Sequence, residues 1–195
     1  MHPIFIELSE KYIGPRVYVR PMQKGDGEGF YKLLQENHNH LLNYVEEVKT
    51  ITSIEKAEIR SRKLHGDWHN RARFVLGIFL NENDNMIGEL WLEPINWEIG
   101  NIEIGYFIAK AHVGKGLVSE SVKLALILIF KELGLAKAEI HVDSTNERSY
   151  SVAQRLHFKE EARIRKRVKH EDGEICDRLY YGLLKEEYEA LDLSP

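Results

Sequence analysis

The stretch that decides the fold lies in the middle of the chain, at residues 102–122, and reads IEIGYFIAKAHVGKGLVSESV. Its first seven residues alternate between two faces, which is the pattern of a β-strand. The more apolar face consists of Ile102, Ile104, Tyr106 and Ile108. The pattern therefore predicts a strand that carries a carboxylate, Glu103, in its middle on the opposite face.

A glycine-rich segment, Ala111–Gly116, follows this strand and opens a helix. Backbone N–H groups at a helix start are unpaired and lie at the positive end of the helix dipole, so they favour an anion such as a phosphate. The spacing excludes a P-loop, because Gly116 and not Ser or Thr follows Lys115, and it excludes a Rossmann fingerprint, because Ser119 stands at the third glycine. The alternative interpretation is a tight turn that only joins strand to helix.

The flanking sequence predicts mixed α+β architecture. A helix runs from Val118 through Leu133 to Gly134, and Asn146 begins a short one. Helices are also expected around Phe30–Leu34 and after Ser53. Strand patterns occupy residues 16–20, 74–80, 86–92, 138–142, 162–169 and 175–183, and turn residues at 81–85 and 171–174 indicate hairpins. We expect one domain over residues 1–195.

Composition excludes several classes of protein. The chain has 195 residues, 27 Lys and Arg against 31 Asp and Glu, and a net charge of −4, which gives little attraction for nucleic acid. Its single cysteine, Cys176, cannot form an intramolecular disulfide, which favours a reducing, cytoplasmic location. The longest apolar run, Leu124–Phe130, is far below the ~20 residues of a membrane span, so no membrane association is expected.

Three segments carry a resemblance to a known family: EIGYFIAKAHVGKGLVSES at 103–121, NERSYSVAQRLHF at 146–158 and DGEICDRLYYGLLKEEY at 172–188. From about Arg16 to Leu184 the chain resembles the GCN5-related N-acetyltransferase superfamily (GNAT), and in particular its ribosomal-protein serine and alanine N-acetyltransferases. The resemblance implies the acyl-CoA N-acyltransferase fold, with a mostly antiparallel central sheet, flanking helices and a splayed strand pair. It also implies that acetyl-CoA, the co-substrate, binds between the strands at 102–108 and 138–142.

The resemblance implies roles for particular residues. In the family the loop (Q/R)xxGx(G/A) binds the pyrophosphate; here Ala111 departs from its first position. The expected acetyl-CoA-binding residues are Phe107, Ile108, Ala109, His112, Val113, Gly114, Lys115, Gly116, Leu117, Asn146 and Ser149. The backbone of residues 107–109 would pair with the pantetheine arm and donate an N–H to the thioester oxygen.

Two catalytic residues follow from the same comparison. Glu103 resembles the general base of several family members and would accept the amine proton; the alternative is an ion-paired structural carboxylate. Ala153 stands where the family often has a tyrosine acid, so the Ser149 hydroxyl would donate to the departing sulfur. For Asn146 and Ser149 the alternative is plain helix capping. His157 stands where the family usually has glycine.

The acceptor is less determined by the sequence. We expect direct acetyl transfer to a primary amine, preferably the N-terminal α-amine of a protein such as a ribosomal protein. A small amine, such as an antibiotic, polyamine or amino acid, is the alternative substrate, and a non-catalytic CoA-binding sensor is the alternative class of protein. The acceptor pocket is expected between residues 37–68, with Tyr44 and Trp68, and the last hairpin. The sequence leaves the oligomeric state open, a homodimer included.

Other features rank lower as sites. His65 and His69 are four residues apart, but Gly66 replaces the glutamate of HExxH, and no metal is expected. Cys176 has no assigned partners for a nucleophile. Four basic residues alternate on one predicted strand face, either as a solvated edge or as a dock for an acidic peptide acceptor: Arg163, Arg165, Arg167 and Lys169.

Overall fold

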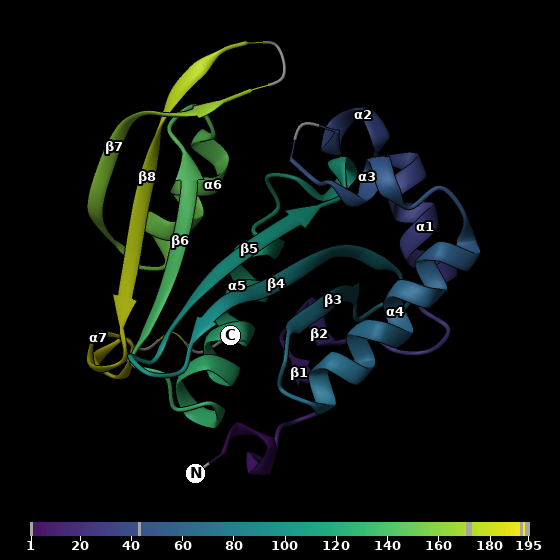
Figure 1. Ribbon diagram of the computed structural model, residues 1–195, viewed down its shortest axis with the longest axis horizontal. Coiled ribbons are helices and arrows are strands. Elements are labelled where there is room, and N and C mark those ends of the chain that lie inside the picture. Colours follow the sequence, from purple (N-terminus) through teal and green to yellow (C-terminus); the bar gives the residue numbers. More distant parts are fainter. Residues whose placement is uncertain (1, 43, 171–172, 192, 194–195) are drawn as a thin grey trace.

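The computed structural model describes residues 2–42, 44–170, 173–191 and 193, and these residues form one eight-stranded sheet (Figure 1). All neighbouring strands are antiparallel except β5 and β6, which are parallel. In spatial order the strands are β1 (Tyr12–Ile13), β2 (Val17–Pro21), β3 (Phe74–Leu80), β4 (Met86–Asn96), β5 (Asn101–Ile108), β6 (Lys137–Asp143), β8 (Ile175–Leu184) and β7 (Lys159–Lys169). The predicted mixed, mostly antiparallel sheet is confirmed.

Helices cover both faces of the sheet. One face packs on α5 (Leu117–Ile127) and α6 (Glu147–Arg155), and the other on α1 (Gly27–Glu36), α2 (His38–Leu41), α3 (Glu47–Thr50) and α4 (Ile54–His69) (Figure 1). The strands serve both cores by alternation: Ile102 and Ile104 of β5 lie in the α5 core, whereas Phe107 lies in the α1–α4 core. Short helices also lie at Pro3–Phe5, Lys110–His112 and α7 (Lys185–Ala190). None of the described helices has the length and apolarity to cross a bilayer.

Strands β5 and β6 pair over only three registers, Asn101 with Lys137, Ile102 with Ala138 and Glu103 with Glu139. Beyond this point β5 continues to Ile108 and β6 to Asp143, but they no longer pair with each other, and the two strands diverge (Figure 1). The splayed pair implied by the resemblance is therefore present. Glu103 and Glu139 stand at the point of separation.

The central helix departs from its predicted form at its C-terminal end. It was expected to run to Gly134 as one α-helix, but the α-helical part ends at Ile127 and residues 128–132 are π-helical. Leu133 N–H donates to Leu128 O, five residues back, at 2.8 Å. This wider turn continues the helix up to Gly134, whose φ of +67° ends it.

The turns on either side of α6 explain two residues of the resemblance. Asn146 caps α6, because its Oδ1 accepts the Ser149 N–H at 3.1 Å. His157, just beyond α6, has a φ of +63°, the left-handed conformation in which glycine carries no penalty. The left-handed backbone at this position therefore explains why the family usually has glycine there.

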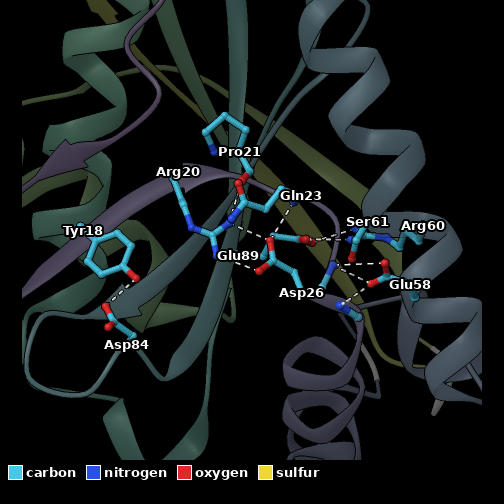
Figure 2. Close-up of polar contacts among 12 residues, drawn as sticks. Tyr18, Arg20, Pro21, Gln23, Asp26, Glu58, Arg60, Ser61, Asp84 and Glu89 are labelled. Atoms are coloured by element: carbon cyan, nitrogen blue, oxygen red, sulfur yellow. Dashed lines mark hydrogen bonds and ion pairs between the residues drawn. The ribbon is translucent and has the colours of Figure 1, made fainter.

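A charged layer is buried between α4 and the sheet (Figure 2). Arg60 of α4 donates to both oxygens of Glu89 on β4 at 2.8 Å, and Glu89 is only 1% exposed. The guanidinium also donates to Glu47 of α3 at 2.9 Å and lies 4.5 Å from the Phe30 ring centroid. A fully paired buried charge of this kind holds α1, α3 and α4 in one arrangement on the sheet.

Candidate active site

Glu103 faces an open hollow where β5 and β6 separate. The hollow has a volume of about 450 Å³ and is lined by Pro94, Ile95, Asn96, Trp97, Asn101, Glu103, Glu139 and His141. The side chain of Glu103 is 27% exposed, so it is accessible to a ligand without being freely solvated. The structure thus puts the predicted base beside a space that an amine can enter.

His141 of β6 joins Glu103 to a second carboxylate. Its Nδ1 lies 2.9 Å from Glu103 Oε2, and its Nε2 lies 3.1 Å from Glu139 Oε2. Burial lowers the pKa of His141, but the hydrogen bonds and charges of Glu103 and Glu139 outweigh burial and raise it. The carboxylate–imidazole–carboxylate chain can therefore take up a proton at Glu103 and pass it toward Glu139.

The chain continues to the protein surface through Lys137. Its Nζ lies 2.9 Å from Glu139 and 2.6 Å from Glu161 of β7. Asn101 Nδ2 also donates to Glu139, at 3.2 Å. Burial raises the pKa of Glu139, but Lys137 and these hydrogen bonds lower it overall, so the outer carboxylate of the relay stays ionised.

A second hollow, of about 320 Å³, is also lined by Glu103 and contains two arginines in its lining. It is lined by Glu103, His141, Arg167, Arg178 and Tyr180. Arg178 Nη2 lies 3.1 Å from Asp143, and the Tyr180 ring lies 4.5 Å from the His141 ring. Arg167 is the exposed member of the set. An acceptor in this hollow would therefore meet both a carboxylate and guanidinium groups.

The predicted anion loop has the conformation that such a site needs. Gly114 and Gly116 have φ values of +78° and +77°, and α5 begins directly after them. The N–H groups of residues 114–119 have no hydrogen-bond acceptor among the described residues. These groups are therefore available to a phosphate at the positive end of α5.

Arg16, directly before β2, brings a guanidinium to this loop. Its Nη1 donates to the Lys115 carbonyl oxygen at 2.7 Å, and its Nε donates to Glu120 of α5 at 2.8 Å. Glu120 is 8% exposed and also accepts the backbone N–H groups of Arg16 and Val17. The loop thus has an arginine beside it, although Ala111 stands where the family motif has Gln or Arg.

Only some backbone groups near the end of β5 are free to bind the pantetheine arm. Ala109 N–H donates to Ile87 O at 2.7 Å, and Ala109 O accepts the His112 N–H at 2.9 Å. Because successive residues of a strand point their backbone groups to opposite edges, Tyr106 and Ile108 face the side from which β6 has departed. The backbone groups of Phe107 and Ala109 point away from that side, so those of Tyr106 and Ile108 are the ones available to pantetheine.

Ser149 of α6 contacts β5 through Tyr106, a residue of the more apolar face of that strand. The hydroxyls of Ser149 and Tyr106 lie 2.9 Å apart, and either can be the donor. The Tyr106 hydroxyl also lies within hydrogen-bond distance, 3.1 Å, of the Ser149 carbonyl oxygen, which can accept its one proton instead. Burial raises the pKa of Tyr106 to about 12. Tyr106 thus stays neutral and can support Ser149 as a hydrogen-bond donor.

Several predicted site residues lie elsewhere. Trp68, expected in an acceptor pocket, is buried against Phe74 in the α5 core and lines neither hollow. Trp97 of the β4–β5 turn lines the larger hollow. Tyr44 is 59% exposed and lines neither hollow. His65 and His69 of α4 bring their Nε2 atoms within 3.2 Å, because α4 passes through Gly66 unbroken.

Comparison with known proteins identifies the family. The sequence profile of the acetyltransferase (GNAT) domain matches residues 16–159, most of the chain. The protein belongs to the GNAT acetyltransferase family. The GNAT relative YjcK of Bacillus subtilis strain 168, named as a probable N-acetyltransferase, is 32% identical over 162 residues, 80% of this chain and 87% of YjcK. YdaF of the same strain, provisionally named a ribosomal N-acetyltransferase, is 27% identical over 180 residues, 91% of this chain and 96% of YdaF.

Solved structures share the GNAT fold over almost the whole chain. The ribosomal-protein-S5-alanine acetyltransferase of Vibrio fischeri superposes with a TM-score of 0.82 at 18% identity, covering 92% of this chain and 99% of that one. The ribosomal L7/L12 α-N-protein acetyltransferase RimL, solved with coenzyme A, gives a TM-score of 0.77 at 20% identity, covering 90% and 97%. As a GNAT enzyme, this protein is an acetyl-CoA-dependent acetyltransferase.

Proposed function

We propose that this enzyme transfers the acetyl group of acetyl-CoA directly to the N-terminal α-amine of a protein, such as a ribosomal protein. The observation that carries the proposal is the position of Glu103, which stands where β5 and β6 separate and faces both hollows. A base at this point lies between the space for a thioester in the splay and the space for an amine beside it.

Acetyl-CoA binding is assigned to the loop and to the free edge of β5. The unpaired N–H groups of residues 114–119 suit the diphosphate, Lys115 adds positive charge, and Arg16, paired with Glu120, holds the loop through the Lys115 carbonyl. The pantetheine arm would then run between β5 and α6, with Ile108 and Tyr106 on one side and Asn146 and Ser149 on the other.

The residues around the splay supply the proton transfers of the reaction. Glu103 accepts the proton of the attacking amine, and His141 shares it with Glu139. The amine nitrogen bonds to the thioester carbon, and the carbon–sulfur bond breaks. The departing sulfur takes a proton from the Ser149 hydroxyl, which the neutral Tyr106 phenol supports and solvent replenishes.

The acceptor class follows from the open hollows and their charge. An α-amine, with a free pKa near ~8, loses its proton more easily than lysine near ~10.4, so one partly exposed carboxylate suffices as base. Arg167 and Arg178 line the smaller hollow together with Glu103 and favour an acceptor with an acidic side chain near its amine. The provisional name of YdaF and the fold shared with ribosomal-protein acetyltransferases support the same class.

Release of free CoA in the presence of a panel of amines tests the proposal. The panel contains peptides with free and blocked amino termini, spermidine and single amino acids, and mass spectrometry locates the acetyl group. We expect turnover with free peptide termini, acetylated at the α-amine, and none with blocked termini. Turnover confined to spermidine or amino acids would contradict the acceptor class, whereas acetylation confined to lysine side chains would contradict the assignment of the α-amine.

A further inference from the structure

Three metal-binding side chains meet at one end of the sheet, outside the residues that the reaction uses. Asp143 ends β6, His170 follows β7, and Cys176 lies at the start of β8. Cys176 Sγ lies 3.4 Å from His170 Nε2, and the same nitrogen lies 3.7 Å from Asp143 Oδ2. All three ligand atoms lie within 4.8 Å of one another.

The cluster is largely removed from solvent and incompletely satisfied. Cys176 is 6% exposed, and the side chains of His170 and Asp143 are each 13% exposed. The second oxygen of Asp143, Oδ1, is buried and has no hydrogen-bond partner among the described residues; Arg178 approaches it at 3.1 Å outside hydrogen-bond geometry. Oδ1 therefore has an ion pair but, in the described part of the chain, no hydrogen-bond donor, and Oδ2 is the oxygen that faces His170.

We propose that Asp143, His170 and Cys176 form a binding site for a zinc-class divalent cation. Tetrahedral coordination with bonds of about 2.3 Å to sulfur and about 2.0–2.2 Å to nitrogen and oxygen separates neighbouring ligand atoms by ~3.4–3.6 Å. The sulfur–nitrogen separation already has this value, and the nitrogen–oxygen separation exceeds it slightly. Binding releases the thiol proton, and a water completes the coordination.

The contacts fit a shared cation better than an activated cysteine nucleophile. In a nucleophile–histidine–carboxylate triad the two partners use the two different nitrogens of the imidazole. Here the sulfur and the carboxylate both contact Nε2, and one N–H cannot point well at both. A cation at the centre of the three atoms removes this conflict, because sulfur, nitrogen and oxygen then all bind through lone pairs.

The position of the site gives it a structural consequence. It joins the outer end of β6 to both strands of the β7–β8 hairpin, beside Arg178, which lines the smaller hollow. A bound cation would hold the hairpin against β6 and fix Arg178 through Asp143. The proposal does not depend on the identity of the amine acceptor.

Titration of the reduced full-length protein with Co²⁺ tests the site directly. Because Cys176 is the single cysteine of the chain, any thiolate-to-cobalt charge-transfer band reports on this residue. We expect one equivalent of Co²⁺ to produce the band, Zn²⁺ to abolish it, and Cys176→Ser to lack it. His170→Ala and Asp143→Asn should each weaken Co²⁺ binding by at least ~10-fold.

A control variant separates this site from the other histidine pair. The His65→Ala/His69→Ala variant removes the exposed pair of α4 and should leave the band and its midpoint unchanged. Circular dichroism of each variant checks that it is folded. Absence of the band in folded wild-type protein, or a band whose midpoint is unaffected by His170→Ala and Asp143→Asn, would overturn the proposal.

Discussion

At the residue scale, the role of Glu103 depends on its charge and not on its size. Glu103→Gln keeps the shape and the contact to His141 but cannot accept a proton. We expect kcat to fall by ~10²–10⁴-fold with unchanged affinity for acetyl-CoA. Steady-state kinetics and calorimetric titration measure the two quantities, and Glu98→Gln, in the exposed β4–β5 turn, is the control. Unchanged turnover across the pH range would make Glu103 a structural residue.

His141 gives the site a pH-dependent contribution to stability. Because its pKa is raised in the folded protein, the stabilisation is fully present below the ordinary histidine pKa of about 6.5 and is lost as pH rises through the folded-state value. We expect the difference in unfolding free energy between wild type and His141→Asn to be largest below about pH 6.5 and to shrink at higher pH. Urea unfolding over a pH series measures it. A difference that grows with pH would contradict a protonated His141 between the carboxylates of Glu103 and Glu139.

Arg167 and Arg165 form a matched pair on β7, since only Arg167 lines the hollow beside Glu103. We expect Arg167→Glu to raise the KM for an acidic peptide about threefold or more at low salt, and the effect to fall at high salt. Arg165→Glu should change the KM less, and neither should alter acetyl-CoA affinity. Equal effects of the two substitutions on the KM would indicate long-range attraction between the basic strand and the peptide, and not a contact of Arg167 in the hollow.

At the element scale, the buried pair of Arg60 and Glu89 connects α4 to β4. Arg60→Met leaves a carboxylate that is 1% exposed without its partner, and we expect a loss of about 3–5 kcal/mol in unfolding free energy. The double variant Arg60→Met/Glu89→Met removes both charges and should recover most of that loss. Chemical denaturation measures both. A double variant as unstable as the single one would show that the pair is needed for more than charge balance.

Most elements could be predicted from the sequence, because the spacing of apolar residues shows which face of a helix or strand is buried. The alternation at 102–108 predicts β5, and Ser53 marks the start of α4, where its Oγ accepts the Lys56 N–H. The short elements β1, α2, α3 and α7 have too few residues for a period and were missed. The π-helical end of α5 depends on how its side chains pack, which no local pattern encodes.

At the scale of the whole molecule, the site depends on residues that the fold brings together from distant parts of the sequence. Glu103, Ser149 and the glycine loop could be named from motifs. His141, Tyr106 and Arg16 could not, because each looks like an ordinary strand residue until β5, β6, α5 and the start of β2 are placed side by side. Asp143, His170 and Cys176 lie too far apart in the sequence to form a recognisable metal motif.

Substitution of a glycine in the anion loop should change how much acetyl-CoA stabilises the protein. Gly114 and Gly134 both have positive φ and open space where a Cβ would stand, so Gly114→Ala and Gly134→Ala should each cost ~1–2 kcal/mol. Acetyl-CoA at a hundred times its Kd should stabilise wild type and Gly134→Ala by ~2.7 kcal/mol. Only Gly114→Ala, which lies in the anion loop, should lose part of this gain. Thermal melts measure it, and equal gains in both variants would place the ligand elsewhere.

The most direct test of the central claim is a crystal structure of the protein with acetyl-CoA. The account predicts the diphosphate on the N–H groups of residues 114–119 and the thioester between β5 and β6, with its carbonyl carbon facing the hollow beside Glu103. A diphosphate bound away from the start of α5, or a thioester on the far side of β5 from Glu103, would contradict it.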